Sequence, residues 1–293
     1  MYDKSNLERT SLYHNEQMLN SGLASLNKNT VDNWRHNRMY SFVKKIVEFD
    51  KNFKWLTVGD GRFGSNAMKL MEYGATNVMC TDLDNYLIKY SAEKKKINKY
   101  KKENAENLSF CDNQFDFVLC KESFHHFPRP MLALIEMFRV AKIGIILIEP
   151  RDYYIDRPLF PLANRILNFL KNRHDGHFFE EVGNYVYTVS ERELEKFMLG
   201  MHKNTIAFSG INDHYLKISG DNIENLNILM KLKFLLLKTI ITVKNLLNLL
   251  SLSKTNLLRA IMFKNTVNQD LKLIIQKNGF KFKILPKNPH IRE

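Results

Sequence analysis

Three glycines and an acid are the residues whose spacing most clearly points to chemistry. Gly59, Gly61 and Gly64 form a Gly-x-Gly-x-x-Gly turn after the apolar run at residues 55–58. Glycines so placed let a strand turn sharply into a helix and let backbone N–H groups approach a ligand closely. Asp82 lies eighteen residues after Gly64, and an acid there can accept hydrogen bonds from both hydroxyls of a ribose. This spacing predicts a nucleotide-type cofactor site without naming the cofactor.

A second group of candidate residues could move a proton. His125 and His126 follow an apolar run at residues 115–120, and Glu122 and Glu149 also end predicted strands. Histidine titrates near neutrality, so either histidine could act as a base toward an acceptor. The alternative is one packed histidine and one solvated histidine in the loop. For Glu149 the alternative role is that of an orienting hydrogen-bond acceptor.

Two arginines precede the first predicted strand, on a predicted helix. A guanidinium of Arg35 or Arg38 could hold a cofactor carboxylate in a bidentate contact, and the alternative is a pair with Asp or Glu. Trp34 and Tyr40 could pack on the cofactor, although a place in the core is favoured.

The elements that must position these residues alternate between strand and helix. Such alternation predicts an α/β fold: a doubly wound, mostly parallel, Rossmann-like sheet with helices on both faces. Ligands bind at the carboxyl ends of the strands in such folds, so the candidate residues should gather at one sheet edge. Strands are predicted at 54–58, 77–81, 97–102, 115–120 and 143–148, and helices at 65–73, 84–96 and 131–142.

The pattern changes after Pro150. Residues 1–150 are predicted to hold N-terminal helices and the cofactor-binding core, and residues 151–265 a largely helical insertion that covers the site as a lid. The segment 266–293 is predicted to return to the sheet, with a helix at 269–277 and a strand at 280–285.

The segment 104–116, Asn-Ala-Glu-Asn-Leu-Ser-Phe-Cys-Asp-Asn-Gln-Phe-Asp, resembles the acid loop and fourth strand of class I S-adenosylmethionine-dependent methyltransferases. The resemblance covers residues 35–150. A lead-in of about fifty residues and a single glycine-rich turn also favour this cofactor over a dinucleotide. The family often has an acid where Thr57 stands here, and Asp60 could substitute for it in part.

The resemblance implies roles for individual positions. Gly59, Gly61 and Gly64 would lie under the methionine part of S-adenosylmethionine. Asp82 and Leu83 would bind the ribose. The remaining implied contacts are Ala105 and Glu106 beside the adenine, and Lys121 and Glu122 bordering the transfer site.

A closer resemblance links residues 34–40, 121–130, 183–187 and 192–195 to a poorly characterised bacterial methyltransferase group, loosely linked to surface-polysaccharide biosynthesis. It implies methyl transfer to a small-molecule or sugar-linked acceptor. An RNA or protein methyltransferase is the alternative. From other classes, an NAD(P)-dependent oxidoreductase and a non-catalytic cofactor-binding module stay open.

Bulk properties add little about partners. The net charge of +13 permits nucleic acid as a partner, but a general lysine bias explains it better, so nucleic acid is not favoured. Cys80, Cys111 and Cys120 form no even disulfide set, and residues 1–20 contain no apolar signal core, so a cytoplasmic protein with reduced thiols is expected.

Three further groups of residues carry weaker signals. The segment His174-Asp175-Gly176-His177 matches no defensible metal spacing, so no metal is expected. Residues 225–264 are apolar and interrupted by lysines; a lid helix or a homodimer interface is favoured there, with peripheral membrane contact as the alternative. Tyr185, Tyr187 and the residues 212–215 could line a polar substrate pocket or pack within the insertion.

Overall fold

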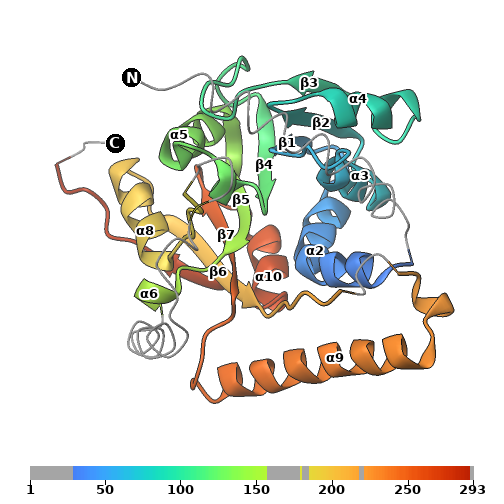
Figure 1. Ribbon diagram of the computed structural model, residues 1–293. Helices are drawn as coiled ribbons and strands as arrows, with labels where there is room; N and C mark the ends of the chain where they lie inside the picture. The colour runs from blue at the N-terminus through green and yellow to red at the C-terminus, as the bar shows by residue number, and fades with distance from the viewer. Residues whose placement is uncertain (1–28, 157–178, 180–184, 218–220, 291–293) are drawn as a thin grey trace.

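A central sheet organises the computed structural model, which describes residues 29–156, 179, 185–217 and 221–290. The strand order is β3-β2-β1-β4-β5-β7-β6-β8. Strands β1 to β5 pair in parallel, whereas β7 runs antiparallel between β5 and β6, and β8 runs antiparallel to β6 (Figure 1). This topology confirms the predicted α/β, mostly parallel, Rossmann-like sheet.

The chain order of the elements follows the predicted alternation as far as β5. The strands are β1 Lys54–Val58, β2 Asn77–Asp82, β3 Tyr100–Lys102, β4 Phe115–Lys121, β5 Ala141–Pro150, β6 Thr205–Ile211, β7 Leu257–Phe263 and β8 Lys281–Ile284. The helices are α2 Val31–Phe49, α3 Ser65–Glu72, α4 Tyr86–Glu93, α5 Pro130–Val140, α6 Tyr153–Asp156, α8 Glu191–Gly200, α9 Ile228–Leu249 and α10 Gln269–Lys277, with short 3₁₀ turns at Phe124–His126 and Ile223–Asn225.

Apolar side chains on the two faces of the sheet form two cores. Alternate residues of β1 point to opposite faces, so Trp55 lies in one core and Leu56 in the other. The first core packs the sheet against α2, α3 and α10, and the second packs it against α5 and α8 (Figure 1). Both faces are therefore covered, and ligands are left with the strand ends.

The segment 151–265 differs from the expected helical insertion, because β6 and β7 are strands of the sheet itself. All seven residues of Leu257–Phe263 are buried. A strand covered on both faces has no polar alternation, so periodicity alone cannot separate its apolar run from a helix. The segments added to the sheet are therefore two: 151–190 and 212–256.

Both added segments leave the sheet at the same edge. β5 ends at Pro150 and β6 ends at Ile211, and both residues lie opposite Leu257, the first residue of β7. This is the carboxyl edge of the parallel strands, where the candidate site residues were expected.

Candidate active site

The glycine-rich turn joins β1 to α3 in the conformation that its sequence predicts. Gly59 and Gly64 both have a φ of +69°, a backbone region that favours glycine. Ser123, from the loop after β4, donates its hydroxyl to the Gly59 carbonyl at 2.6 Å. A Cβ at Gly59 would lie 2.6 Å from the Cβ of Ser123. The turn and the loop after β4 are thus packed directly against each other.

Asp60 supports this turn from inside. Its buried carboxylate accepts the backbone N–H groups of Asn66 and Ala67 at 2.9 and 2.8 Å, and the Thr57 hydroxyl at 2.9 Å. Burial raises the pKa of Asp60 to about 6, although these hydrogen bonds act to lower it. The predicted cofactor contact of the Asp60 side chain is corrected here: the carboxylate faces the first turn of α3, which has unpaired N–H groups to satisfy.

Asp82 lies at the end of β2, beside the same turn. A Cβ at Gly61 would lie 2.8 Å from the Asp82 carboxyl carbon, so only glycine leaves room for this carboxylate. Asp82 accepts the Asp84 N–H at 2.9 Å, and burial raises its pKa to about 7. Asp82 also accepts the Gly61 N–H of the turn and pairs with no Lys or Arg among the described residues, so its carboxylate fits the two hydroxyl donors of a ribose. Leu83 follows it, half-buried.

The side chains of the acid loop 104–107 hold the loop in place. Glu106 accepts the Arg129 backbone N–H at 2.7 Å and the Arg129 Nε–H at 2.8 Å, which connects the loop to the start of α5. Asn104 accepts the Glu106 N–H at 3.0 Å. The Glu106 carboxylate is therefore committed to Arg129, which a local motif could not reveal. Ala105 is half-buried against the second core.

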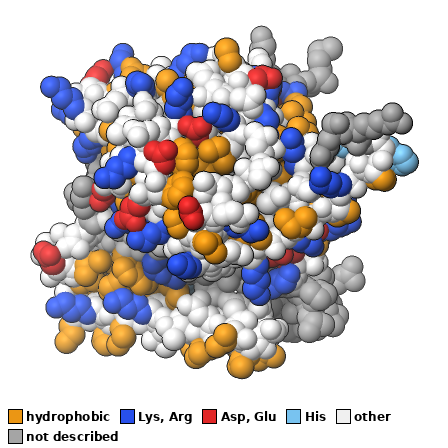
Figure 2. Space-filling view, turned by 180° about the vertical axis from the view of Figure 1, so that it is seen from behind, with side chains coloured by type: hydrophobic (Ala, Val, Ile, Leu, Met, Phe, Trp, Pro, Cys, Tyr) orange, Lys and Arg blue, Asp and Glu red, His pale blue; other side chains and the backbone are white. Residues whose placement is uncertain are grey.

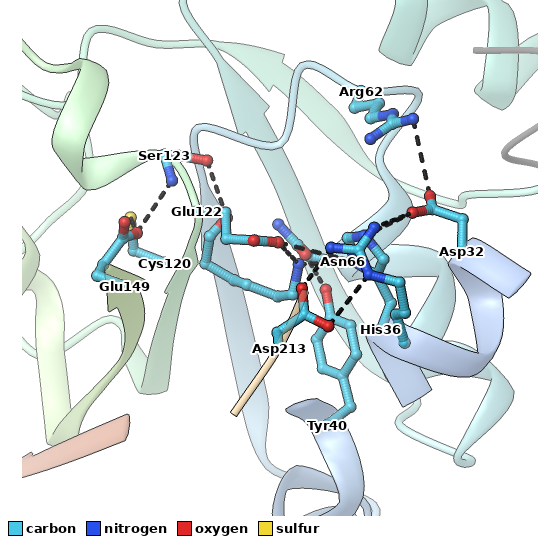
Figure 3. Close-up of polar contacts among 12 residues, drawn as sticks. Asp32, His36, Tyr40, Arg62, Asn66, Cys120, Glu122, Ser123, Glu149 and Asp213 are labelled. Carbon is cyan, nitrogen blue, oxygen red and sulfur yellow. Dashed lines mark hydrogen bonds and ion pairs between the residues drawn. The ribbon is translucent and has the colours of Figure 1, made fainter. Parts of the chain in front are cut away.

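A buried carboxylate orients His125. Glu149, fully buried at the end of β5, accepts the N–H groups of Ser123 and Phe124 at 2.9 and 3.0 Å through one oxygen. Its other oxygen lies 2.7 Å from His125 Nδ1. Figure 3 shows the contact between Ser123 and Glu149, with Cys120 beside Glu149. Glu149 thus fixes both the backbone of this loop and the His125 ring, which is the orienting role considered for it.

His126 and Tyr187 complete the surroundings of His125. The two histidine rings lie 4.0 Å apart between centroids. Tyr187, in the first added segment, donates its backbone N–H to the His125 carbonyl at 3.1 Å and packs its ring against Phe124. The structure therefore places both predicted histidines at the strand edge, with a residue of the first added segment beside them.

Glu122 and Lys121 form an ion pair under α2. The Lys121 ammonium contacts Glu122 and lies 2.8 Å from His36 Nδ1. Burial alone would raise the pKa of Glu122, but the charges of Lys121 and His36 lower it to about 2. An acid this strong stays ionised and is a weak proton acceptor, so the predicted catalytic role of Glu122 gains no support.

Arg35 does not present a free guanidinium to a cofactor carboxylate. It donates Nε–H to Asp213 at 3.1 Å, contacts the other oxygen of Asp213 as well, and donates to Asp32 at 3.0 Å. Arg38 donates to the Asn212 carbonyl at 2.8 Å. Both arginines attach α2 to the start of the second added segment, and Arg35 forms the pair with an Asp that was considered as its alternative.

Several polar residues of this region were missed by sequence reasoning. Figure 3 shows Asp32 between His36 and Arg62 of the glycine-rich turn, and Tyr40 against Asn66 of α3. Their only sequence signal is that α2 carries polar residues on the side facing the turn. Tyr40 is buried in the first core, as favoured.

Among the residues that the structure describes, no group of three His, Cys, Asp or Glu side chains could hold a metal ion. The segment His174–His177 lies outside the described residues. The predicted pocket residues Tyr185, Tyr187 and 212–215 are described. Asp213 and Asn212 contact the α2 arginines, and the Tyr215 ring centroid lies 5.4 Å from the guanidinium carbon of Arg35.

The parallel strands β1 to β5, the antiparallel strand β7 between β5 and β6, and a glycine-rich turn at the carboxyl edge define the class I methyltransferase fold. Residues 56–148 match the methyltransferase-domain family. None of the curated proteins matches the sequence significantly.

Three solved structures illustrate the likeness. The magnesium protoporphyrin IX methyltransferase of Synechocystis PCC 6803, with bound S-adenosylhomocysteine, is 14% identical, with 74% of this chain and 95% of that chain covered and a TM-score of 0.52. The YcgJ protein of Bacillus subtilis is 19% identical (68% and 82% covered, TM-score 0.46). A Thermotoga maritima methyltransferase, described as a possible histamine N-methyltransferase, is 16% identical (79% and 93% covered, TM-score 0.44).

The first of these supports the fold, and the family match supports the activity. The chain is an S-adenosylmethionine-dependent methyltransferase with a class I fold, and S-adenosylmethionine is its cofactor. The oxidoreductase and the non-catalytic module considered from the sequence are therefore set aside.

Proposed function

We propose that this enzyme transfers the methyl group of S-adenosylmethionine to a hydroxyl group of a small-molecule or sugar-linked acceptor, with His125 as the general base. The observation that carries the proposal is the contact between His125 Nδ1 and the fully buried Glu149. A hydroxyl must lose its proton during methylation, whereas an amine or thiol needs a base less.

The contact with Glu149 determines which nitrogen can act. A carboxylate that accepts from Nδ1–H keeps the proton on that nitrogen, so Nε2 carries the lone pair. When bound, the cofactor supplies the methyl group and its leaving group. The protein then has to hold the acceptor oxygen in line and take its proton, and His125 Nε2 is the group we assign to that proton.

The residues assigned to the cofactor are separate from the His125 base. Asp82 and the backbone of Gly59–Gly64 would hold the ribose and methionine parts, and Ala105 and Leu83 would border the adenosine. Lys121 and Glu122 neutralise each other beside the transfer site. Arg35 and Arg38 would act through the position of α2 and contact no cofactor atom.

The acceptor class is supported by the first added segment. Tyr187 packs beside His125 and donates its hydroxyl to Glu193 at 2.7 Å, and Tyr185 is half-exposed nearby in sequence. Aromatic rings with polar tips suit sugars and other small polar ligands. The segments 151–190 and 212–256 leave the sheet at this edge, and we propose that they cover the acceptor.

The test is a transfer assay with radiolabelled S-adenosylmethionine on three acceptor pools: nucleotide sugars and oligosaccharides, RNA, and protein. We expect label in the saccharide pool, at a hydroxyl group. The His125→Gln variant should lose turnover by about 10²- to 10⁴-fold and still bind S-adenosylhomocysteine. Labelling confined to RNA or protein would contradict the acceptor class, and full turnover by His125→Gln would contradict the base.

A further inference from the structure

Helix α9 packs on the rest of the molecule along only one of its sides. Its buried residues are Phe234, Leu237 and Ile241. Phe234 meets the ring of Trp34, in the first turn of α2, at 5.2 Å between centroids. In Figure 1, α9 lies along the bottom of the molecule, beyond α2 and α10. This helix therefore has a large surface that faces away from the protein.

That outward surface is apolar. Six side chains of α9 fall within a sector of about 100° when residues are placed about 100° apart around the axis. This sector, the α9 stripe, lies opposite the buried side. Figure 2 shows orange side chains along the lower edge of the molecule, where α9 lies. The α9 stripe consists of Ile228, Leu232, Leu235, Leu236, Val243 and Leu246, which are 49–81% exposed.

Lysines border the α9 stripe on both sides. Lys231 and Lys238 lie on one flank and Lys233 and Lys244 on the other, each about 90–130° from the centre of the stripe. Lys238 also places its ammonium 4.3 Å from the Phe234 ring centroid, next to the buried side. Long lysine side chains in this position can extend to phosphate groups while their stems cover apolar surface. The arrangement is that of a helix lying in the plane of a membrane surface.

The charges around α9 favour a membrane surface over a second copy of the chain as the partner of the α9 stripe. The sequence contains no Asp or Glu from residue 225 to residue 269. Two α9 helices packed by their stripes would bring lysine flanks together without a carboxylate to pair with them, whereas an anionic lipid surface supplies the missing charge. No described helix is long and apolar enough to cross a membrane.

We propose that α9 docks this enzyme on an anionic phospholipid surface, with the α9 stripe in the interfacial layer and the four lysines at the phosphates. The second added segment, which contains α9, leaves the sheet at the edge that carries the candidate site. Docking would hold that edge near the membrane. The proposal rests on the surface of α9 and does not depend on the identity of the acceptor.

The test is flotation of the full-length protein with vesicles of phosphatidylcholine alone and with vesicles that also contain phosphatidylglycerol. We expect binding to the anionic vesicles. The variant Leu232→Ser/Leu235→Ser/Leu246→Ser changes exposed side chains only and should reduce binding at least about tenfold. Lys231→Gln/Lys233→Gln should remove most of the preference for anionic vesicles.

The matched control is Leu273→Ser, which changes a leucine of α10 that is 52% exposed; this variant should float like the wild type. Absence of flotation with anionic vesicles would overturn the proposal, as would equal flotation of the triple variant. Light scattering on the same samples identifies the competing occupant: a dimer that the triple variant dissociates, without vesicle binding, would assign the α9 stripe to a second copy.

Discussion

The cofactor side of the site and the acceptor side are built in opposite ways. On the cofactor side, contacts such as Thr57 to Asp60 and Asp60 to Ala67 join residues close in sequence. On the acceptor side, Glu149 orients His125 across 24 positions and Asp213 holds Arg35 across 178. The glycine-rich turn is therefore specified by a local motif, whereas the acceptor side depends on the tertiary fold, as does the Glu106–Arg129 contact of the loop 104–107.

The two sides also differ in how their carboxylates are compensated. Burial raises the pKa of Asp82 to about 7, whereas Lys121 and His36 overcome burial and lower the pKa of Glu122 to about 2. A carboxylate whose charge is uncompensated gains most from the hydroxyl donors of a ligand. We infer that Asp82 is prepared for a ligand, while Glu122 is satisfied within the protein.

The largest expected effect is on turnover, from Glu149→Gln. The glutamine oxygen can still accept from Ser123 and Phe124, but its NH₂ group would face His125 Nδ1 and move the ring proton to Nε2. We expect turnover to fall about 10²- to 10⁴-fold with unchanged affinity for S-adenosylhomocysteine, measured by transfer kinetics and calorimetry. Glu48→Gln, the same change on the surface of α2, is the control. Normal turnover of Glu149→Gln would remove the orienting role.

The next largest effect is on stability, from Arg35→Met. The side chains of Arg35 and Asp213 are each only 8% exposed, so the change leaves a buried carboxylate without its main partner. We expect a loss of about 3–5 kcal/mol in the free energy of unfolding, measured with urea. Arg38→Met should cost less, because Arg38 lies 3.9 Å from Asp213. A stable Arg35→Met protein with weak cofactor affinity would restore the cofactor contact predicted from sequence.

A smaller effect is expected for cofactor affinity in Asp82→Asn. Loss of one charge-assisted hydrogen bond should weaken S-adenosylhomocysteine binding about 10- to 100-fold at pH 8. Without ligand, the variant should melt at a higher temperature than the wild type at this pH. The reason is that a carboxyl whose pKa is raised by folding destabilises the folded state once it is ionised. Unchanged affinity would show that the ribose lies elsewhere.

The smallest effect is the pH dependence of the same binding step. Because Asp82 has a raised pKa of about 7, it loses its charge as the pH falls through neutrality. If only the ionised form binds the ribose well, the wild-type affinity for S-adenosylhomocysteine should fall about fourfold from pH 8 to pH 6.5. Calorimetry at both pH values should find little change for Asp82→Asn. An equally steep profile in that variant would assign the titration to another group.

Sequence reasoning succeeded where neighbours along the chain determine the structure. The residues of β1 and α10 could be predicted because an apolar run or an amphipathic period is bounded by glycine or asparagine. It failed at β7, whose continuous burial removes any alternation. It could not name the partners of Arg35 and Glu106, because Asp213 and Arg129 become their neighbours only in the folded chain.

The separation of a cofactor side from an acceptor side is tested most directly by a single calorimetric series. In it, S-adenosylhomocysteine is titrated into the wild type, Asp82→Asn and His125→Gln. The account predicts weak binding by Asp82→Asn and an affinity for His125→Gln within about twofold of the wild type, because His125 faces the acceptor. Wild-type affinity in Asp82→Asn, or an equal loss in His125→Gln, would contradict it.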